Sequence, residues 1–324
     1  MGLLFEGRWY DKWYDTEKTK GEFVRSESRF RNWITSDGSP GPSGAGGFEA
    51  ASGRYHLFVS MACPWAHRTL IFRELKNLQQ LIGVTRVKPL MLENGWELSE
   101  EAALTSPVKG LTYLYELYLR ARPDYSGRVT VPVLWDCEQE TIVSNESAEI
   151  IRMFNGAFNE LVPPTVDYYP AADQGEIDRL NRMVYDGINN GVYRAGFATT
   201  KKAYEAAYDQ LFSTLDTLEE LLGDRRYLVG NQITEADWRL FTTLVRFDAV
   251  YVGHFKVNRQ RIEDYSNLSG YLRDLYQQPG VAATVDFDEI KSHYYGSHKQ
   301  INPTGIVPKG PLLDYLRPHR RKNH

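Results

Sequence analysis

One cysteine, placed between a strand-like and a helix-like segment, constrains the fold of this chain more than any other feature. Residues 55–60 are rich in aromatic and β-branched side chains, as is typical of a β-strand. Cys63 follows them and precedes Pro64, whose fixed φ angle and missing N–H suit the first position of a helix. Residues 66–78 then carry apolar side chains at helical spacing. The sequence therefore predicts a helix with Cys63 at its N-terminus.

This position favours the thiolate form of Cys63. Unpaired N–H groups and the positive end of the helix dipole lower a thiol pKa from its ordinary value of about 8.5. Ala66 stands where a Cys-x-x-Cys redox motif has its second cysteine. Cys63 is therefore predicted to be a single-thiol nucleophile that needs an external thiol, and cytosolic glutathione is the obvious supply. The alternative is a buried, inert cysteine at a helix start.

The composition excludes several classes of protein. The chain has 324 residues, enough for two domains, and its two cysteines exclude a disulfide scaffold and suit a reducing compartment. The formal net charge of −4 gives no reason to expect a nucleic acid or an anionic membrane as a partner. We expect neither a signal peptide nor a membrane span, and therefore a cytoplasmic protein. Cys137, at the exit of a strand-like segment, is expected to have no catalytic role.

The order of predicted elements indicates a thioredoxin-like domain followed by an all-helical one. Residues 54–156 read as β-α-β-α-β-β-α. The later strands are predicted at residues 84–92, 129–134 and 141–143, and the later helices at residues 111–121 and 147–154. In the second half, apolar residues from Tyr204 to Leu222 predict a long amphipathic helix that ends near Gly223. A capping box from Thr234 to Asp237 opens another helix and is assigned to structure.

Breaks in composition set the predicted domain boundaries. The N-terminal extension and its Gly/Pro/Ser loop are expected to pack across the domains rather than fold alone. The basic C-terminal tail is expected to be solvated and partly mobile. The predicted parts are an extension and loop at residues 1–47, a thioredoxin-like domain at 48–160, a linker at 161–173, a helical domain at 174–296 and a tail at 297–324.

Two further motifs fit the binding of a small peptide. Pro132 interrupts a predicted strand, and a cis Val131–Pro132 bond in a thioredoxin-like domain turns the backbone polar groups of Val131 outward. Such groups can pair with an extended peptide like glutathione, although a plain edge-strand proline is the alternative. At the next helix start, Ser147 and free N–H groups can hold a carboxylate while Glu146 pairs with an ammonium. Ser147 can also simply cap the helix.

Together these residues resemble the glutathione transferases. The motif Cys63-Pro64-Trp65-Ala66, Val131-Pro132, Glu146-Ser147 and the capping box carry the resemblance, which is closest to the xi class, the glutathionyl-hydroquinone reductases. It extends from Trp9 to about Pro308. Other matching stretches are residues 89–96, 191–198, 246–251 and 297–303.

The resemblance implies a thioredoxin-like plus all-helical fold that forms a homodimer, with glutathione as co-substrate and no bound cofactor or metal. It implies that Cys63 is the nucleophile and that Tyr193, Tyr251 and Tyr294 line the pocket for an aromatic substrate. Each tyrosine, taken alone, would more often be a packing residue. The residues that the resemblance places on glutathione are Trp96, Arg128, Val131, Glu146 and Ser147. Of these, Trp96 can also be a loop anchor and Arg128 a surface charge.

The resemblance also implies a reaction. Cys63 would take the glutathione from a glutathionyl-hydroquinone as a mixed disulfide, and Tyr193 is the candidate for giving a proton to the ring. A second glutathione would then release oxidised glutathione. Two alternatives remain open at this stage. One is a glutaredoxin-like thioltransferase or dehydroascorbate reductase, and the other is a non-catalytic scaffold that keeps the fold.

Overall fold

The computed structural model describes residues 2–321, which form two units. The first unit comprises the residues up to Trp13, Ser26–Val166 and Thr284–His293. The second comprises Tyr14–Arg25, Asp167–Ala283 and the residues from Tyr294 onward. In the described part of the chain, every helix is too short or too polar to cross a membrane.

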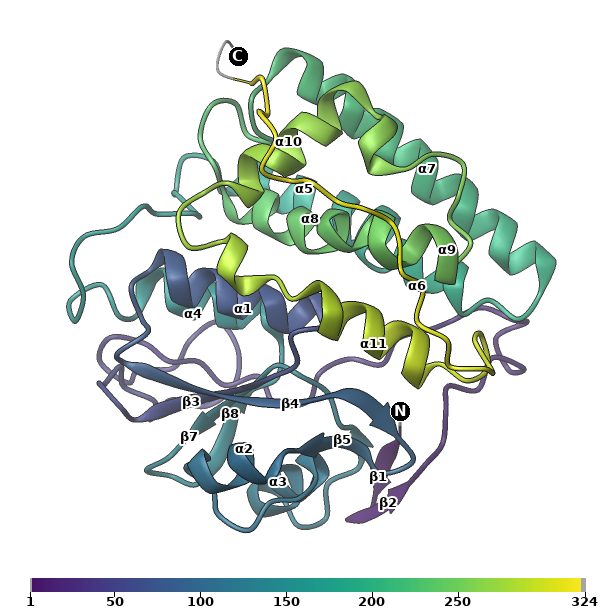
Figure 1. The fold of residues 1–324 in the computed structure, drawn as a ribbon. Coiled ribbons are helices and arrows are strands. Elements are labelled where there is room, and N and C mark those ends of the chain that lie inside the picture. The colour runs from purple at the N-terminus through teal and green to yellow at the C-terminus, as the bar shows by residue number, and fades with distance from the viewer. Residues whose placement is uncertain (1, 322–324) are drawn as a thin grey trace. The chain divides into compact units, whose positions relative to one another are not determined.

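A five-stranded sheet forms the centre of the first unit (Figure 1). Its strand order is β5-β4-β3-β7-β8, and only β3 and β4 run parallel, while the remaining neighbours are antiparallel. Helices α1 and α4 lie together on one face of the sheet, and α3 lies on the other. The elements are β3 (Tyr55–Val59), α1 (Pro64–Leu75), β4 (Ile82–Leu92), β5 (Gly95–Leu98), α2 (Glu100–Thr105), α3 (Leu114–Ala121), β7 (Val133–Asp136), β8 (Thr141–Ser144) and α4 (Ser147–Gly156).

The predicted order of strands and helices in this unit is confirmed, with further short elements and one shorter strand. β5 and the short helix α2 have no counterpart among the predicted segments. The strand predicted at residues 129–134 begins only at Val133. Pro132 has no N–H to donate to a neighbouring strand, so the ladder starts after it. Ahead of it, β6 (Gly127–Arg128) pairs with the N-terminal strand β1 (Leu3–Phe5).

The N-terminal extension contributes to both units. In the first unit, β1 pairs with β6 on one side and with β2 (Arg8–Tyr10) on the other, which gives a small antiparallel sheet. In the second unit, the segment Tyr14–Arg25 contacts the turn before α7, where Thr199 N donates to Gly21 O at 3.0 Å. Gly21 has a φ of +90°, and a Cβ there would collide with Thr200.

The second unit is helical, as predicted. The long amphipathic helix is α7, which ends one residue after Gly223, and its leucines at the predicted spacing are buried. The capping box of α8 is confirmed, with Thr234 N donating to Asp237 Oδ2 at 2.8 Å. The elements are α5 (Gln174–Val184), η1 (Tyr185–Asn189), α6 (Gly191–Gly196), α7 (Lys201–Asp224), α8 (Glu235–Arg246), η2 (Phe247–Tyr251), α9 (Val252–His254), η3 (Ile262–Asp264), α10 (Ser266–Tyr276), η4 (Ala282–Thr284) and α11 (Phe287–Ser297). Two of these elements are shared with the first unit, which includes residues Thr284–His293. The last residue of η4 and the part of α11 up to His293 belong to it.

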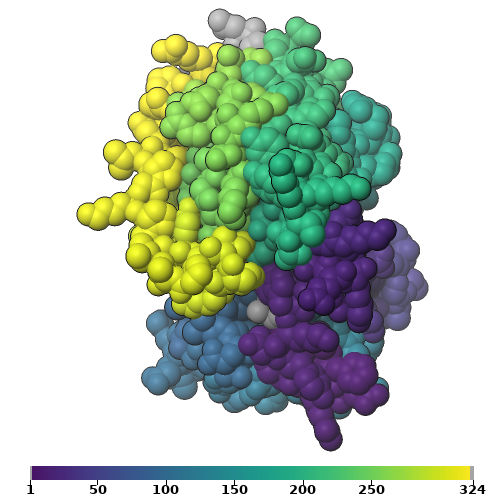
Figure 2. Space-filling view, turned by 90° about the vertical axis from the view of Figure 1, so that its right-hand side faces the viewer, coloured from purple at the N-terminus to yellow at the C-terminus, as the bar shows by residue number. Residues whose placement is uncertain are grey.

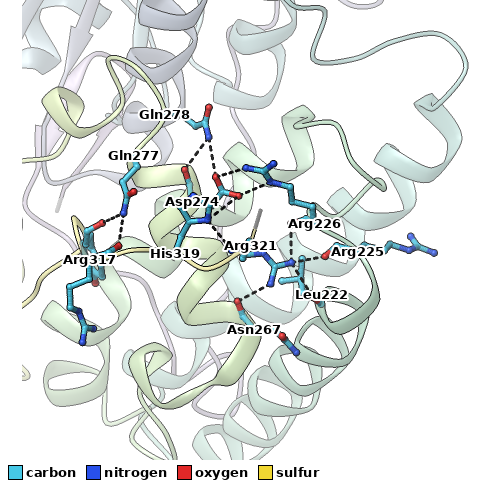
Figure 3. A network of polar contacts seen from close by, with 11 residues as sticks. Leu222, Arg225, Arg226, Asn267, Asp274, Gln277, Gln278, Arg317, His319 and Arg321 are labelled. Atoms are coloured by element: carbon cyan, nitrogen blue, oxygen red, sulfur yellow. Dashed lines mark hydrogen bonds and ion pairs between the residues drawn. The ribbon is translucent and has the colours of Figure 1, made fainter. Parts of the chain in front are cut away.

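The expectation of a solvated tail is wrong at Arg321, the last residue that the structure describes. The tail, yellow in Figure 2, runs along the green helices of the same unit, and Arg321 is only 3% exposed. Figure 3 shows the Arg321 guanidinium donating to the carbonyl oxygens of Leu222 and Arg226, each at 3.0 Å. These carbonyls lie at the C-terminal end of α7, where helix carbonyls lack partners and a cation is favourable. Lys322, predicted with the same tail, lies outside the described residues.

Replacing Arg321 should destabilise the second unit. We expect Arg321→Gln to lower the free energy of unfolding by about 1–3 kcal/mol, because buried carbonyls at the end of α7 lose their charged donor. The measurement is the midpoint of urea denaturation. Arg320→Gln is the matched control, since Arg320 is exposed and its loss should cost less than about 0.5 kcal/mol. Equal shifts for the two variants would contradict the anchoring role of Arg321.

Candidate active site

Cys63 is the N-cap residue of α1, as the sequence predicts. Pro64 occupies the first helical position, and the Cys63 side chain makes no capping hydrogen bond to the helix. Its Sγ atom lies 3.5 Å from the carbonyl oxygen of Val131. Cys63 is intermediate in burial, so it is not fully buried, and its role as a nucleophile stays a prediction. Its position at the N-terminus of a helix, near the positive end of the helix dipole, is the arrangement that stabilises a thiolate.

The Val131–Pro132 peptide bond is cis, as predicted. The residue before it is held by a buried tyrosine, because Tyr118 Oη donates to Thr130 O at 2.8 Å and accepts from Thr130 N at 3.2 Å. Asn145 Nδ2 in turn donates to the same Tyr118 oxygen at 3.2 Å. One phenol therefore connects the cis-proline turn to the residue that precedes Glu146. No motif in the sequence identified Tyr118.

Glu146, not Ser147, caps helix α4. Glu146 Oε1 accepts from Ala148 N at 3.0 Å, and its other oxygen accepts from Ser28 Oγ at 3.1 Å. The alternative of Ser147 as a simple helix cap is therefore wrong. Ser147 is the first residue of the helix and is 3% exposed. Its hydroxyl is not used for capping.

Arg68 is a residue of this region that sequence reasoning missed. It lies on α1 with 2% exposure, its Nη1 donates to Ser147 Oγ at 3.4 Å, and its guanidinium stacks over Trp65 at 4.6 Å. A hydroxyl has a single proton, so Ser147 keeps its own proton for another acceptor while it accepts from Arg68. The available signal was a cation on the buried side of a predicted helix, one turn after Cys63.

Trp96 and Arg128 lie in two short strands, and Arg128 contacts the N-terminal extension. Trp96 is in β5, is 4% exposed and stacks on the His293 ring with centroids 4.9 Å apart. Arg128 is in β6, and its guanidinium donates to the Lys12 carbonyl oxygen. Their contact with glutathione stays a prediction. The small N-terminal sheet explains why Arg128 is held in place, which the sequence did not reveal.

In the second unit, the three predicted tyrosines form a hydrogen-bonded chain. The Tyr294 hydroxyl lies 2.5 Å from that of Tyr193 and 3.0 Å from that of Tyr251. Tyr251 and Tyr294 are fully buried, whereas Tyr193 is partly exposed. We call these three residues the tyrosine cluster. Tyr193 comes from α6, Tyr251 from η2 and Tyr294 from α11.

Burial controls where a negative charge can reside in the tyrosine cluster. It raises the pKa of Tyr251 and of Tyr294 well above the ordinary value, and the neighbouring Tyr193 adds to this effect. The Arg246 cation opposes both shifts. A phenolate is therefore disfavoured at the two buried members. Tyr193 is the partly exposed member, and its hydroxyl lies within hydrogen-bond distance of the Tyr294 hydroxyl.

The environment of the second cysteine, Cys137, disfavours its thiolate form. Burial raises the pKa of the Cys137 thiol, and the neighbouring carboxylates of Asp136 and Glu138 raise it further. Cys137 therefore stays protonated at neutral pH, as expected of a residue without catalytic role. Among the described residues, no group of three His, Cys, Asp or Glu side chains is arranged to hold a metal ion.

The chain is similar along its length to known proteins. Family models described as "Glutathione S-transferase, N-terminal domain" and "Glutathione S-transferase, C-terminal domain" match residues 62–157 and 201–274. The glutathionyl-hydroquinone reductase YqjG of Escherichia coli is 60% identical over 323 residues, which cover 99% of this chain and 98% of that protein. A glutathione-bound structure of that protein has a TM-score of 0.88 and 56% identity, and covers 99% of each chain. A xi-class glutathione transferase from Natrialba magadii has a TM-score of 0.87 and 46% identity, and covers 99% of this chain and 96% of its own.

Alkylation should separate the two thiols. At pH 7 we expect iodoacetamide to modify Cys63 rapidly and Cys137 slowly, because a thiol with a raised pKa is protonated there and reacts only as pH increases. Peptide mass spectrometry over a time course measures both rates. In Cys63→Ser the fast phase should disappear. A fast phase at Cys137 would contradict this assignment.

Proposed function

Because the chain belongs to the xi-class glutathione transferases, the glutathionyl-hydroquinone reductase family, we propose that it removes glutathione from glutathionyl-hydroquinones. The products are the free hydroquinone and oxidised glutathione. The observation that carries the proposal is the single thiol at the start of α1, beside the carbonyl of Val131 and without a second cysteine at Ala66. Such a thiol can form a mixed disulfide with glutathione but cannot resolve it internally.

We assign the binding of glutathione to the residues around Cys63. The cysteinyl backbone of the peptide pairs with Val131, and the γ-glutamyl carboxylate is held by Ser147 and the start of α4. Glu146 is assigned to the γ-glutamyl ammonium, and Trp96 and Arg128 to the remaining glutathione contacts. The hydrogen bond from Arg68 to Ser147 supports this assignment, because it leaves the serine proton for a carboxylate.

In the first step, the Cys63 thiolate attacks the sulfur of the glutathionyl-hydroquinone. An S–S bond forms between Cys63 and glutathione, and the S–C bond to the ring breaks. The electron pair of that bond goes to the ring carbon, which must receive a proton because an aryl carbanion is a very poor leaving group. The ring is reduced by two electrons, and the two sulfurs are oxidised to a disulfide.

The tyrosine cluster is our candidate for the source of that proton. Tyr193 is assigned as the general acid, Tyr294 as the donor that stabilises its phenolate, and Tyr251 as the hydrogen-bond partner of Tyr294. The order of exposure supports this assignment, since the two fully buried phenols resist ionisation. Proton transfer from solvent then restores Tyr193.

In the second step, a second glutathione thiolate attacks the glutathione sulfur of the mixed disulfide. This attack forms oxidised glutathione and returns Cys63 as a thiolate. The cycle consumes one glutathione and needs no other reductant. We also expect a homodimer in the cytoplasm, where glutathione is plentiful and both cysteines stay reduced.

A substrate panel tests the function. We expect the purified chain to turn over glutathionyl-hydroquinone faster than dehydroascorbate or a glutathione mixed disulfide. Cys63→Ser should abolish the reduction, while isothermal titration calorimetry still detects glutathione binding. A preference for dehydroascorbate or the mixed disulfide would favour a thioltransferase instead. Full inactivity, with no glutathione adduct on Cys63 by mass spectrometry, would favour a scaffold.

Tyrosine variants test the acid. Tyr193→Phe should lower kcat for glutathionyl-hydroquinone by roughly 10²–10⁴-fold, the usual contribution of a general acid. Tyr294→Phe should cost about tenfold, because one hydrogen bond to the phenolate is lost. Exchange with a glutathione mixed disulfide is the control reaction, since its thiolate leaving group needs no proton at carbon. Equal losses in both reactions would show that the tyrosines act only in packing.

A further inference from the structure

A segment of the N-terminal extension lies against the tyrosine cluster within the second unit. Residues Tyr14–Arg25 are fastened there by the backbone of Thr199 and by its side chain, whose Oγ1 donates to Thr16 Oγ1 at 3.1 Å. Thr200 Oγ1 also donates to the Lys20 carbonyl at 3.1 Å. The segment is therefore held in a defined position next to α6 and α7, and its last residues reach the Tyr193 ring.

Arg25 is the charged residue that this segment presents to Tyr193. Its Cζ atom lies 4.9 Å from the centroid of the Tyr193 ring, and its Nε donates to Asn190 Oδ1 at 3.3 Å. Asn190 immediately precedes the helix that carries Tyr193. Phe23 packs on the same guanidinium, with a Cζ-to-centroid distance of 5.4 Å. The cation thus lies over the ring of Tyr193.

A cation over a phenol ring interacts with the charge of the ring. When the hydroxyl loses its proton, the negative charge spreads into the ring, and the attraction to a cation over its face increases. Arg25 therefore binds the phenolate more strongly than the phenol. An interaction that grows as charge develops is the kind that accelerates a reaction rather than only holding a structure.

We propose that Arg25 is a positioning and charge-stabilising residue for proton delivery by Tyr193. This inference rests on the proposed function, in which Tyr193 protonates the ring carbon as the S–C bond breaks. Arg25 makes the phenolate of Tyr193 easier to form and acts through that phenol, without accepting or donating a proton. The N-terminal segment thereby supplies part of the catalytic apparatus of the helical unit. Arg246, a fully buried cation, acts on the two buried tyrosines in the same sense.

The test compares two reactions in one set of variants. We expect Arg25→Gln to lower kcat for glutathionyl-hydroquinone by about tenfold, with little change in KM. Exchange with a glutathione mixed disulfide should stay at the wild-type rate, because no carbon is protonated. Arg25→Lys keeps a cation and should recover part of the loss. Arg194→Gln is the matched control, since Arg194 adjoins Tyr193 in the chain but donates to Gln210 on the exposed surface.

The outcomes separate this inference from the proposed function. Wild-type turnover of glutathionyl-hydroquinone tests the function alone, and its absence would overturn both. If that turnover is present, equal losses in the two reactions of Arg25→Gln would overturn the inference by showing a structural role. An unchanged kcat, or a lysine variant as slow as the glutamine variant, would also overturn it. A selective loss with partial rescue by lysine supports it.

Discussion

The start of helix α1 imposes the constraint on which the chemistry of this chain depends. The first N–H groups of a helix have no backbone acceptor within the helix. A side chain, a water molecule or a ligand must accept their hydrogen bonds. In most helices an oxygen-bearing side chain does this. Here the N-cap is Cys63, whose side chain makes no capping hydrogen bond. Pro64, the first residue of the helix, has no N–H group. The backbone therefore offers its partial positive charge to a sulfur atom.

The same requirement recurs at the start of α4, with a different solution. There Glu146 caps the helix, and the Ser147 hydroxyl is not needed for capping. That hydroxyl accepts a hydrogen bond from Arg68 instead. Arg68 belongs to α1, so the two helix starts are coupled through one buried guanidinium. A buried cation is costly unless it is well partnered, and its contacts with Trp65 and Ser147 supply part of that compensation. Substituting Arg68 would disturb both starts together.

Much of this could be read from the sequence, because local patterns decide it. The strand before Cys63, the helix after it and the capping box at Thr234 each depend on residues within a few positions of one another. What the sequence could not give are contacts between distant segments. The strand pairing of Leu3 with Arg128, the bond from Tyr118 to Thr130 and the burial of Arg321 have no local signature. The composition of a basic tail does not indicate whether one of its arginines binds the carbonyl groups at the end of a helix, as Arg321 does.

The tyrosines show why local reasoning also stops short of a mechanism. Each of the three is an ordinary aromatic residue in its own segment, and only the fold makes Tyr294 the middle of a chain of hydroxyls. Once they are joined, their unequal burial distinguishes the two ends of the chain, because burial raises the pKa of Tyr251 while Tyr193 is partly exposed. The Arg25 cation lies over the ring of Tyr193 at the exposed end. The Arg246 cation partly offsets the rise in the pKa of Tyr251 that burial causes. The function of a phenol in such a group is therefore set by its neighbours.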